Sequence, residues 1–215
     1  MIGRITVLAL CWLAALPAFA QTALQSPQPT EAVPAVAALP KPATVRVTLQ
    51  TTDGPIIVEL EKERAPITTA NFLHYVDQKR FDGIGFYRAA KMAPDFGLVQ
   101  AGIRDPRRVF PPIPHEPTSK TGLSHIDGTI SMARNAPGTA SADFFIIVGN
   151  MPSLDADPKQ PGDNSGFAAF GHVVVGMDIV RRILDAPKSP TLGEGVMKGQ
   201  MLSEPIRILT ARRGG

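Results

Sequence analysis

The sequence predicts a mainly β fold, a closed eight-stranded antiparallel β-barrel capped by two helices. Apolar and polar residues alternate in a series of short segments, which is the pattern of half-buried strands. Turn signals separate these segments, and tightly joined strands must be antiparallel. Helical spacing of apolar residues occurs in two segments. Eight strands form a barrel that their own side chains fill, so we expect a binding site on its outer face.

The domain is expected to begin with a hairpin near residue 44. Residues 45–49 alternate as a strand, and Asp53-Gly54 is a typical hairpin turn. Residues 56–60 form the returning strand. The other strands are expected at residues 84–90, 98–102, 129–133, 144–148, 168–175 and 206–210.

The first helix is expected to start at Pro66, because the first helical turn has no partner for a backbone N–H at that position. Ile67, Ala70, Leu73 and Val76 recur at helical spacing and predict its buried face. The second helix is expected to be short, and long loops should join several of the elements. This second helix is expected at 177–184, and the long loops at 104–125, 152–166 and 188–203.

Residues 1–20 have the pattern of a secretory signal peptide. Arg4 precedes an apolar run, Pro17 ends the run, and residues 18–20 read Ala-Phe-Ala, a typical cleavage site. The run is shorter than the roughly 20 residues that a membrane-spanning helix needs. An uncleaved membrane anchor is the alternative interpretation.

Residues 21–43 are rich in proline and alanine and predict an extended linker, with a docking motif as the alternative. The third region, 44–215, is the folded domain. Cleavage after residue 20 would remove Cys11, the single cysteine of the chain. A mature chain without thiols suits an oxidising compartment, because nothing in it can mispair.

Composition and motifs exclude several classes of function. The net charge of +3 is small and the basic residues are scattered, whereas nucleic-acid binding needs a concentrated basic surface. The sequence contains no phosphate-binding glycine loop, nucleophile elbow or zinc-protease motif. The four histidines are scattered as well, so we expect neither a metal site nor a cofactor.

Two parts of the sequence carry the functional signal. Residues 86–88 read Phe-Tyr-Arg, and Gln100 follows; residues 128–134 contain Ser-Met-Ala, and residues 143–146 contain Phe-Phe-Ile. Each segment alone is compatible with ordinary barrel core. Together and in this order they resemble the cyclophilins, which are peptidyl-prolyl cis-trans isomerases. The resemblance extends over about residues 44–211 and implies a barrel of the cyclophilin type.

Prolyl isomerisation requires a particular kind of site. The barrier of about 18–20 kcal/mol comes from amide resonance, so catalysis needs neither a nucleophile nor a metal. Twisting the amide localises a lone pair on the prolyl nitrogen. A cationic donor aimed at that nitrogen stabilises the twisted form selectively, and an apolar pocket for the ring strengthens the contact.

The resemblance implies that Arg88 is this donor and that Gln100 holds the substrate backbone. It further implies an apolar pocket for the proline ring and a groove for the preceding residues. The implied pocket walls are Phe145, Leu98 and Leu154, and the implied groove residues are Ala133 and Arg134. The alternatives are that Arg88 is a structural ion-pair partner, that Phe145 is pure core, and that Gln100 only satisfies a strand edge.

The chain departs from the family pattern at several site positions. Arg134 replaces an asparagine, Asp143 a glutamine and Ser153 a tryptophan. Phe96 is a possible substitute for a pocket phenylalanine, and Phe167 lies near the place of a pocket histidine. Because Arg134 and Asp143 have opposite charges on neighbouring strands, we expect them to pair. The rival hypothesis is that Asp143 clamps Arg88 and weakens catalysis.

The expected function is isomerisation of X-Pro bonds in proline-containing polypeptides, assisting the folding of exported proteins in the bacterial periplasm. We expect a monomer that does not bind nucleic acid and leaves the membrane after signal cleavage. The alternative is a catalytically weak module that binds proline peptides as a chaperone or adaptor. A β-barrel carrier of small ligands fits poorly, since the apolar strands predict a filled interior.

Overall fold

The structure is a computed structural model that describes residues 43–214. The expected signal peptide and all but the last residue of the expected linker lie outside the described residues. They therefore stay predictions. Within residues 43–214, no helix combines the length and the apolar character that crossing a membrane requires.

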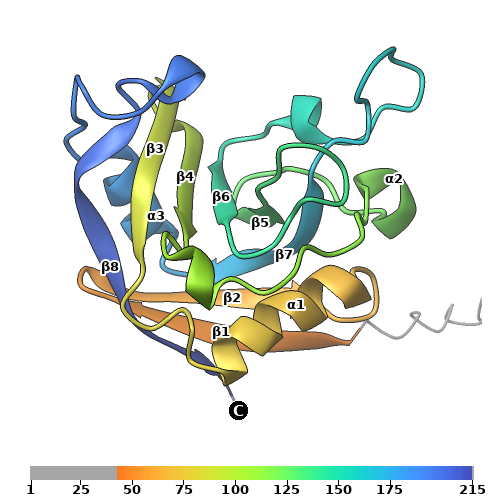
Figure 1. The fold of residues 1–215 in the computed structure, drawn as a ribbon, viewed down its shortest axis with the longest axis horizontal. Coiled ribbons are helices and arrows are strands. Elements are labelled where there is room, and N and C mark those ends of the chain that lie inside the picture. Colours follow the sequence, from red (N-terminus) through yellow and green to blue (C-terminus); the bar gives the residue numbers. More distant parts are fainter. Residues whose placement is uncertain (1–42, 215) are drawn as a thin grey trace, which may run out of the picture. The chain divides into compact units, whose positions relative to one another are not determined.

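Eight strands close into a barrel, as predicted (Figure 1). Their order around the barrel is β1-β2-β7-β5-β6-β4-β3-β8, and β8 closes the barrel by pairing with β1. All neighbouring strands pair antiparallel. The strands are β1 Thr44–Thr51, β2 Gly54–Glu61, β3 Gly85–Ala93, β4 Phe96–Gly102, β5 Thr129–Met132, β6 Phe144–Val148, β7 Ala168–Val175 and β8 Met201–Arg213.

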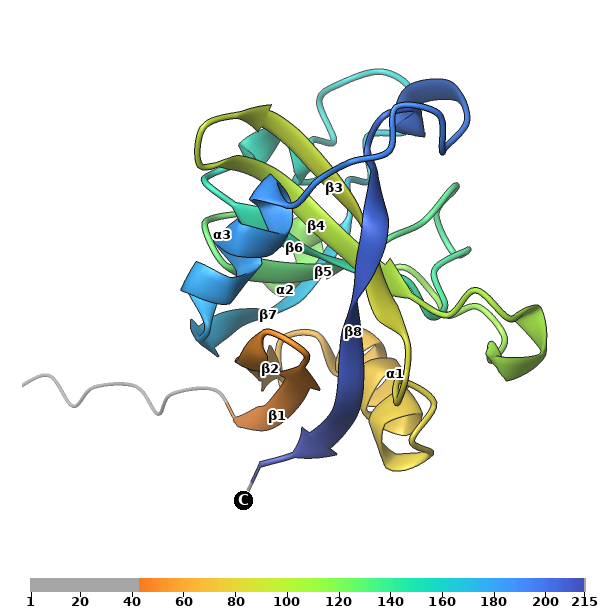
Figure 2. The same cartoon turned by 90° about the vertical axis from the view of Figure 1, so that its left-hand side faces the viewer.

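The two expected helices pack against the barrel. Helix α1 (Pro66–Asp77) contacts β8, β2 and β7, whereas α3 (Met177–Asp185) contacts β3, β2, β4 and β6. They lie on different sides of the barrel (Figure 2). A further helix, α2 (Thr118–Thr121), forms a single turn inside the proline-rich loop. Four residues are too few to produce a helical pattern in the sequence.

The predicted buried face of α1 is half wrong. Ile67 and Ala70 are exposed, whereas Phe72 and Tyr75 are fully buried. The reason is the aromatic packing around Phe81, whose ring lies 4.9 Å from that of Phe72 and 5.0 Å from that of Tyr75. Large aromatic rings bury more apolar area than alanine or isoleucine, so they decide how the helix is rotated.

The long loop after β4 is held against α1 by a buried carboxylate. The Glu116 side chain accepts hydrogen bonds from the backbone amides of Ile67 and Thr68, at 3.2 and 2.6 Å. It also accepts one from the Thr68 hydroxyl at 2.7 Å. These amides belong to the first turn of the helix, where backbone donors lack intrahelical partners. The Glu116 carboxylate thus fixes the loop to the first turn of α1.

The β3–β4 hairpin and strand β8 are longer than expected, and both extensions reach the functional region. The β3–β4 hairpin continues to Ala93 and Phe96, with Asp95 in the left-handed conformation at its tip (φ 50°). Strand β8 begins at Met201, which pairs with Arg88. The expected loop before β8 is correspondingly shorter. This pairing brings the end of the loop beside the centre of β3.

Candidate active site

A register shift in β3 aims two consecutive side chains at the same neighbour. The β3–β4 ladder is irregular between Phe86 and Arg88, and such bulges redirect side chains. Phe86 is fully buried in the barrel core. Tyr87 and Arg88 both contact the side chain of Gln100 on β4. The bulge thus presents a phenol and a guanidinium side by side.

Arg88 is half-buried and bonded to two neutral amides. Its Nη1 donates to Oε1 of Gln100 at 2.8 Å. Its Nε and Nη2 donate to Oε1 of Gln200 at 2.9 and 2.7 Å. Among the residues that the structure describes, no carboxylate forms an ion pair with it, which contradicts the structural ion-pair alternative. Burial lowers the pKa of Arg88 from its ordinary value, but arginine remains charged at neutral pH.

Tyr87 fixes the orientation of the Gln100 amide. Nε2 of Gln100 donates to the Tyr87 hydroxyl at 2.6 Å, and this hydroxyl donates to Oδ2 of Asp143 at 2.8 Å. The amide oxygen of Gln100 is then left to face Arg88. A chain of hydrogen bonds thus runs from Asp143 through Tyr87 and Gln100 to the guanidinium. Gln100 is more than a group that satisfies a strand edge.

The expected pair between Asp143 and Arg134 does not form. Arg134 instead donates from Nη1 to Oδ2 of Asp163 at 2.6 Å, and from Nε and Nη2 to the carbonyl of Gly166. The lengthened loop before β7 supplies both acceptors, and the sequence pattern does not show how that loop folds back. The rival hypothesis is also wrong, because Asp143 accepts from Tyr87 and does not bond to Arg88.

The surroundings of Asp143 explain two shifted pKa values. Burial raises the pKa of the Asp143 carboxyl, and the hydrogen bond from Tyr87 opposes this shift. Burial, followed by the negative charge of Asp143, raises the pKa of Tyr87. Tyr87 is therefore a neutral hydrogen-bond donor at physiological pH. Gly102 leaves room for the carboxylate, since a Cβ there would lie 1.6 Å from Oδ1 of Asp143.

An apolar cluster lies outside the barrel core, and we call it the outer cluster. Phe145, Ile147 and Met151 are its buried members, and several half-buried side chains pack against them. Phe144, the neighbour of Phe145, belongs instead to the barrel core. This division contradicts the alternative that Phe145 is pure core. The half-buried members are Phe96, Leu98, Ala133, Leu154 and Phe167.

The structure thus collects every apolar residue that the resemblance implies for the proline pocket, including Phe96, whose place was open in the sequence. The ring of Phe167 meets that of Phe145 edge-on at 5.4 Å. The guanidinium of Arg134 lies over the Phe167 ring, 5.1 Å from its centre. Ser153 is exposed and leaves this side open. The part that these residues play in substrate binding stays a prediction.

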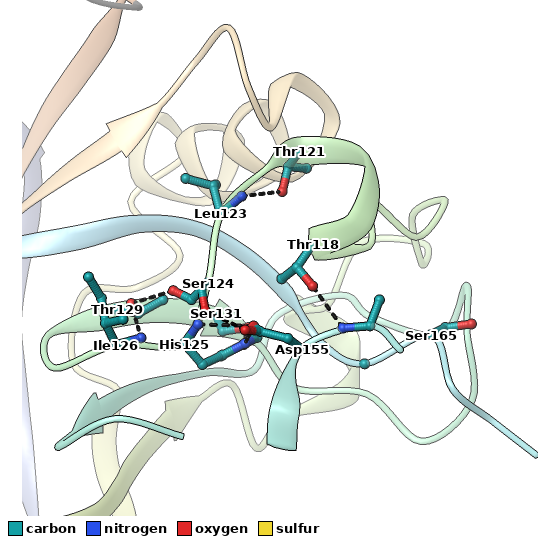
Figure 3. A network of polar contacts seen from close by, with 12 residues as sticks. Thr118, Thr121, Leu123, Ser124, His125, Ile126, Thr129, Ser131, Asp155 and Ser165 are labelled. Carbon is teal, nitrogen blue, oxygen red and sulfur yellow. Dashed lines mark hydrogen bonds and ion pairs between the residues drawn. The ribbon is translucent and has the colours of Figure 1, made fainter. Parts of the chain in front are cut away.

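His125 supports the outer cluster from below, although the sequence does not reveal its role. The residue is fully buried, and its ring is parallel to that of Phe145 at 6.1 Å. Its Nδ1 lies 2.6 Å from Oδ1 of Asp155, and its Nε2 lies 2.9 Å from Oγ of Ser131 (Figure 3). Asp155 directly follows Leu154, so His125 links two members of the outer cluster, Phe145 and Leu154. Within residues 43–214, no cluster of His, Cys, Asp and Glu is suited to a metal ion.

We expect His125 to make stability depend on pH. Burial lowers the pKa of His125 from its ordinary value of 6.5, against the opposing effect of Asp155. The folded protein then binds this proton less readily than the unfolded chain, so the free energy of unfolding falls as the pH drops below about 6.5. Chemical denaturation across pH 5–8 measures the slope. His125→Asn should flatten it, whereas His74→Gln, at an exposed position, should not; an unchanged slope in His125→Asn would contradict the assignment.

Gln200 has no signal in the sequence, because it lies in an expected loop. Its amide oxygen accepts two of the three hydrogen bonds that Arg88 donates to side chains. We expect Gln200→Ala to leave the charge in place but to loosen its aim, and to lower kcat/KM about tenfold. Stability should change little, because Gln200 is only half-buried. The matched control is Gln78→Ala on an exposed helix end; equal activities of the two variants would show that Arg88 needs no such support.

The comparisons with known proteins show the family and the fold of the chain. The family model of the cyclophilin type peptidyl-prolyl cis-trans isomerase/CLD matches residues 46–212. A peptidyl-prolyl cis-trans isomerase of Acinetobacter baylyi is 32% identical over 174 residues, 79% of this chain and 86% of the relative. One of Streptomyces antibioticus is 34% identical over 171 residues, 77% and 96% of the two chains. A solved cyclophilin type isomerase of Cryptosporidium parvum shares the fold, with a TM-score of 0.63 at 20% identity over 80% of this chain and 99% of that one.

Arg88 faces two neutral amides, and a separate apolar cluster lies outside the core of the closed, filled barrel. An enzyme that twists prolyl amides requires a charged donor and an apolar pocket. The family match extends over most of the chain. The chain belongs to the cyclophilin-type peptidyl-prolyl cis-trans isomerases, and it acts on X-Pro bonds in proline-containing polypeptides.

Proposed function

We propose that this isomerase is exported and accelerates the folding of other exported proteins in the periplasm. The features of residues 1–20 and the loss of Cys11 on cleavage support export. X-Pro isomerisation takes tens to hundreds of seconds without catalysis and limits the folding of many chains. An isomerase that accompanies unfolded chains after export would remove this limit.

The proposal extends to the roles of the site residues. Arg88 is the donor to the prolyl nitrogen, and the observation that supports this most is its contact with two neutral amides in place of a carboxylate. Its positive charge therefore remains available to the substrate. Gln100, oriented by Tyr87, holds the substrate backbone. Asp143 acts behind Tyr87 and orients this chain.

The outer cluster is the proposed pocket for the proline ring. Phe145 forms its floor, and Phe96, Leu98, Leu154 and Phe167 form its walls. Ala133 borders the groove for the residues before the proline. Arg134 fastens the lengthened loop, since its guanidinium is already engaged by Asp163 and Gly166. We further propose that the chain acts as a monomer, without nucleic acid, and away from the membrane once the signal is cleaved.

The same observation favours catalysis over the alternative of a binding-only chaperone or adaptor. In a binding-only module a carboxylate could neutralise the arginine without loss of peptide binding. A refolding assay separates the two functions. Its substrate is a denatured protein whose refolding is limited by prolyl isomerisation. The enzyme should raise the rate of the slow phase, and Arg88→Ala should lose this effect. An equal effect of wild type and variant would favour the binding module.

Export has its own test. The full chain is produced in a bacterium, the periplasmic fraction is released by osmotic shock, and the mature N-terminus is determined by mass spectrometry. We expect a product that begins at Gln21 in the released fraction. A variant with charged residues in place of Leu8 and Leu10 should stay unprocessed in the cytoplasm. An intact chain in the membrane fraction would support the uncleaved anchor instead.

A further inference from the structure

A second cavity lies next to the isomerase site, on the other side of Tyr87. Its volume is about 400 Å³, and it is formed by the start of β3, the end of β4, the loop that follows and β8. Ile84, Ile103 and Pro205 provide apolar walls. Three arginines also line the cavity, namely Arg104, Arg108 and Arg207.

The residues around the cavity offset its positive charge only in part, because Asp143, which is bonded to Tyr87, interacts electrostatically with Arg104 alone among the three arginines. Asp105 is the carboxylate in its lining, but both of its oxygens accept hydrogen bonds from Arg107, which is outside the lining. Arg108 donates to the backbone carbonyls of Arg80 and Asp82, and these acceptors carry no charge. The cavity therefore retains an excess of positive charge.

The other two arginines are exposed to solvent and available to a ligand. The guanidinium of Arg104 lies over the Tyr87 ring, 4.8 Å from its centre. Across residues 43–214, the ion pairs formed within the protein include neither Arg104 nor Arg207. Two exposed cations beside apolar side chains in one cavity attract a group that is both acidic and attached to an apolar stem.

Tyr87 connects this cavity to the groove of the isomerase. Its side chain lines the cavity, and its hydroxyl bonds to Gln100 and Asp143. The Asp143 carbonyl accepts from the backbone amide of Ala133 at 2.9 Å, beside the proposed groove for the residues before the proline. Tyr87 is thus shared between the cavity and the hydrogen-bonded chain that borders the proposed groove.

We propose that the cavity is a second subsite for the carboxylate of an acidic residue that precedes the proline in the same polypeptide substrate. The occupant is a glutamate or aspartate flanked by an apolar residue, since the walls are apolar and the charged groups are arginines. The buried Asp143 carboxylate does not line the cavity, and Arg104 shields it from the occupant. The inference rests on the proposed path of the substrate over Gln100 and Ala133.

The test uses pairs of proline peptides. The two peptides of a pair have glutamate and glutamine, respectively, at the same position before the proline, and one pair is made for each position. With the full chain at low salt, we expect kcat/KM to be about threefold higher for glutamate at one of these positions. High salt should remove the preference, because the arginines are exposed. Arg207→Glu should remove or invert the preference for the glutamate peptide. Lys62→Glu changes the net charge equally, at an exposed position that does not line the cavity, and should keep the preference.

A binding measurement keeps the test independent of turnover. The glutamate peptide should shift the backbone amide signals of Gly85 and Ile103 in NMR spectra, and the glutamine peptide should not. Equal rates and equal shifts for both peptides at every position would overturn the proposal, as would a preference that survives in Arg207→Glu. If the wild-type chain shows no isomerase activity but the glutamate peptide still shifts these NMR signals, the result would count against the proposed function and leave the subsite supported.

Discussion

Arg88→Ala is expected to reduce the isomerase activity by about a hundredfold to a thousandfold. Removal of one aimed donor from a preorganised site costs roughly 2.7–4 kcal/mol of transition-state stabilisation. The loss should appear in kcat/KM for a short Ala-Pro peptide, measured as the rate of cis-to-trans conversion. The free energy of unfolding should change little, because Arg88 is half-buried and forms no ion pair with a described carboxylate.

Two further variants sharpen this result. Arg88→Lys retains a charge but lacks the planar fork that reaches both glutamines, so we expect it to recover only part of the activity. Arg182→Ala removes an exposed arginine that pairs with Asp178 on α3, and it should behave as wild type. Activity of Arg88→Ala within a few-fold of wild type would mean that the apolar cluster, not the cation, accelerates the reaction.

Phe144→Ala should mainly lower the stability of the protein, whereas Phe145→Ala should mainly lower its activity, although the two residues are adjacent. The Phe144 ring lies 5.2 Å from that of Phe72 and 5.5 Å from that of Phe81, inside the filled barrel. Its truncation leaves a cavity and should cost about 3–5 kcal/mol of the free energy of unfolding. Chemical denaturation measures this loss, and the folded fraction should retain its activity.

Phe145→Ala should have a smaller effect on stability, about 1–3 kcal/mol, because the half-buried side chains that pack against Phe145 can move into the space or admit water. Its activity should fall at least tenfold, since the prolyl ring loses its floor. Phe145→Leu keeps most of the apolar volume and should recover part of the rate. Equal losses of stability in the two alanine variants, with equal activities, would mean that Phe145 belongs to the core after all.

The fold could be predicted almost completely from the sequence, and so could most members of the outer cluster, although its buried members Ile147 and Met151 were not predicted. Alternation and turn residues are local signals, and each strand needs only its own residues to show them. The resemblance then placed Arg88, Gln100 and Phe145 on strands whose pairing brings them together. The buried face of α1 was predicted less well, because the neighbours of a helix decide which of its faces is buried.

Pairings between long side chains could not be predicted. Arg134 and Asp143 carry opposite charges on neighbouring strands, yet Arg134 turns to Asp163 and Asp143 turns to Tyr87. A guanidinium on a flexible stem reaches several acceptors, and the lengthened loop presents the better ones. Charge and sequence position alone do not choose among them.

By itself the sequence determined the barrel, its filled interior and the isomerase family, and it singled out Arg88 for a role that stays a prediction. These follow from short-range patterns and from motifs in a fixed order. Only the tertiary structure decided which residues surround that arginine. Gln200, 112 positions away in the chain, accepts its hydrogen bonds, and Asp143 holds the neighbouring Tyr87. It also decided that His125 lies beneath the pocket. Such contacts join residues far apart in the chain, and only closure of the barrel brings them within hydrogen-bonding distance.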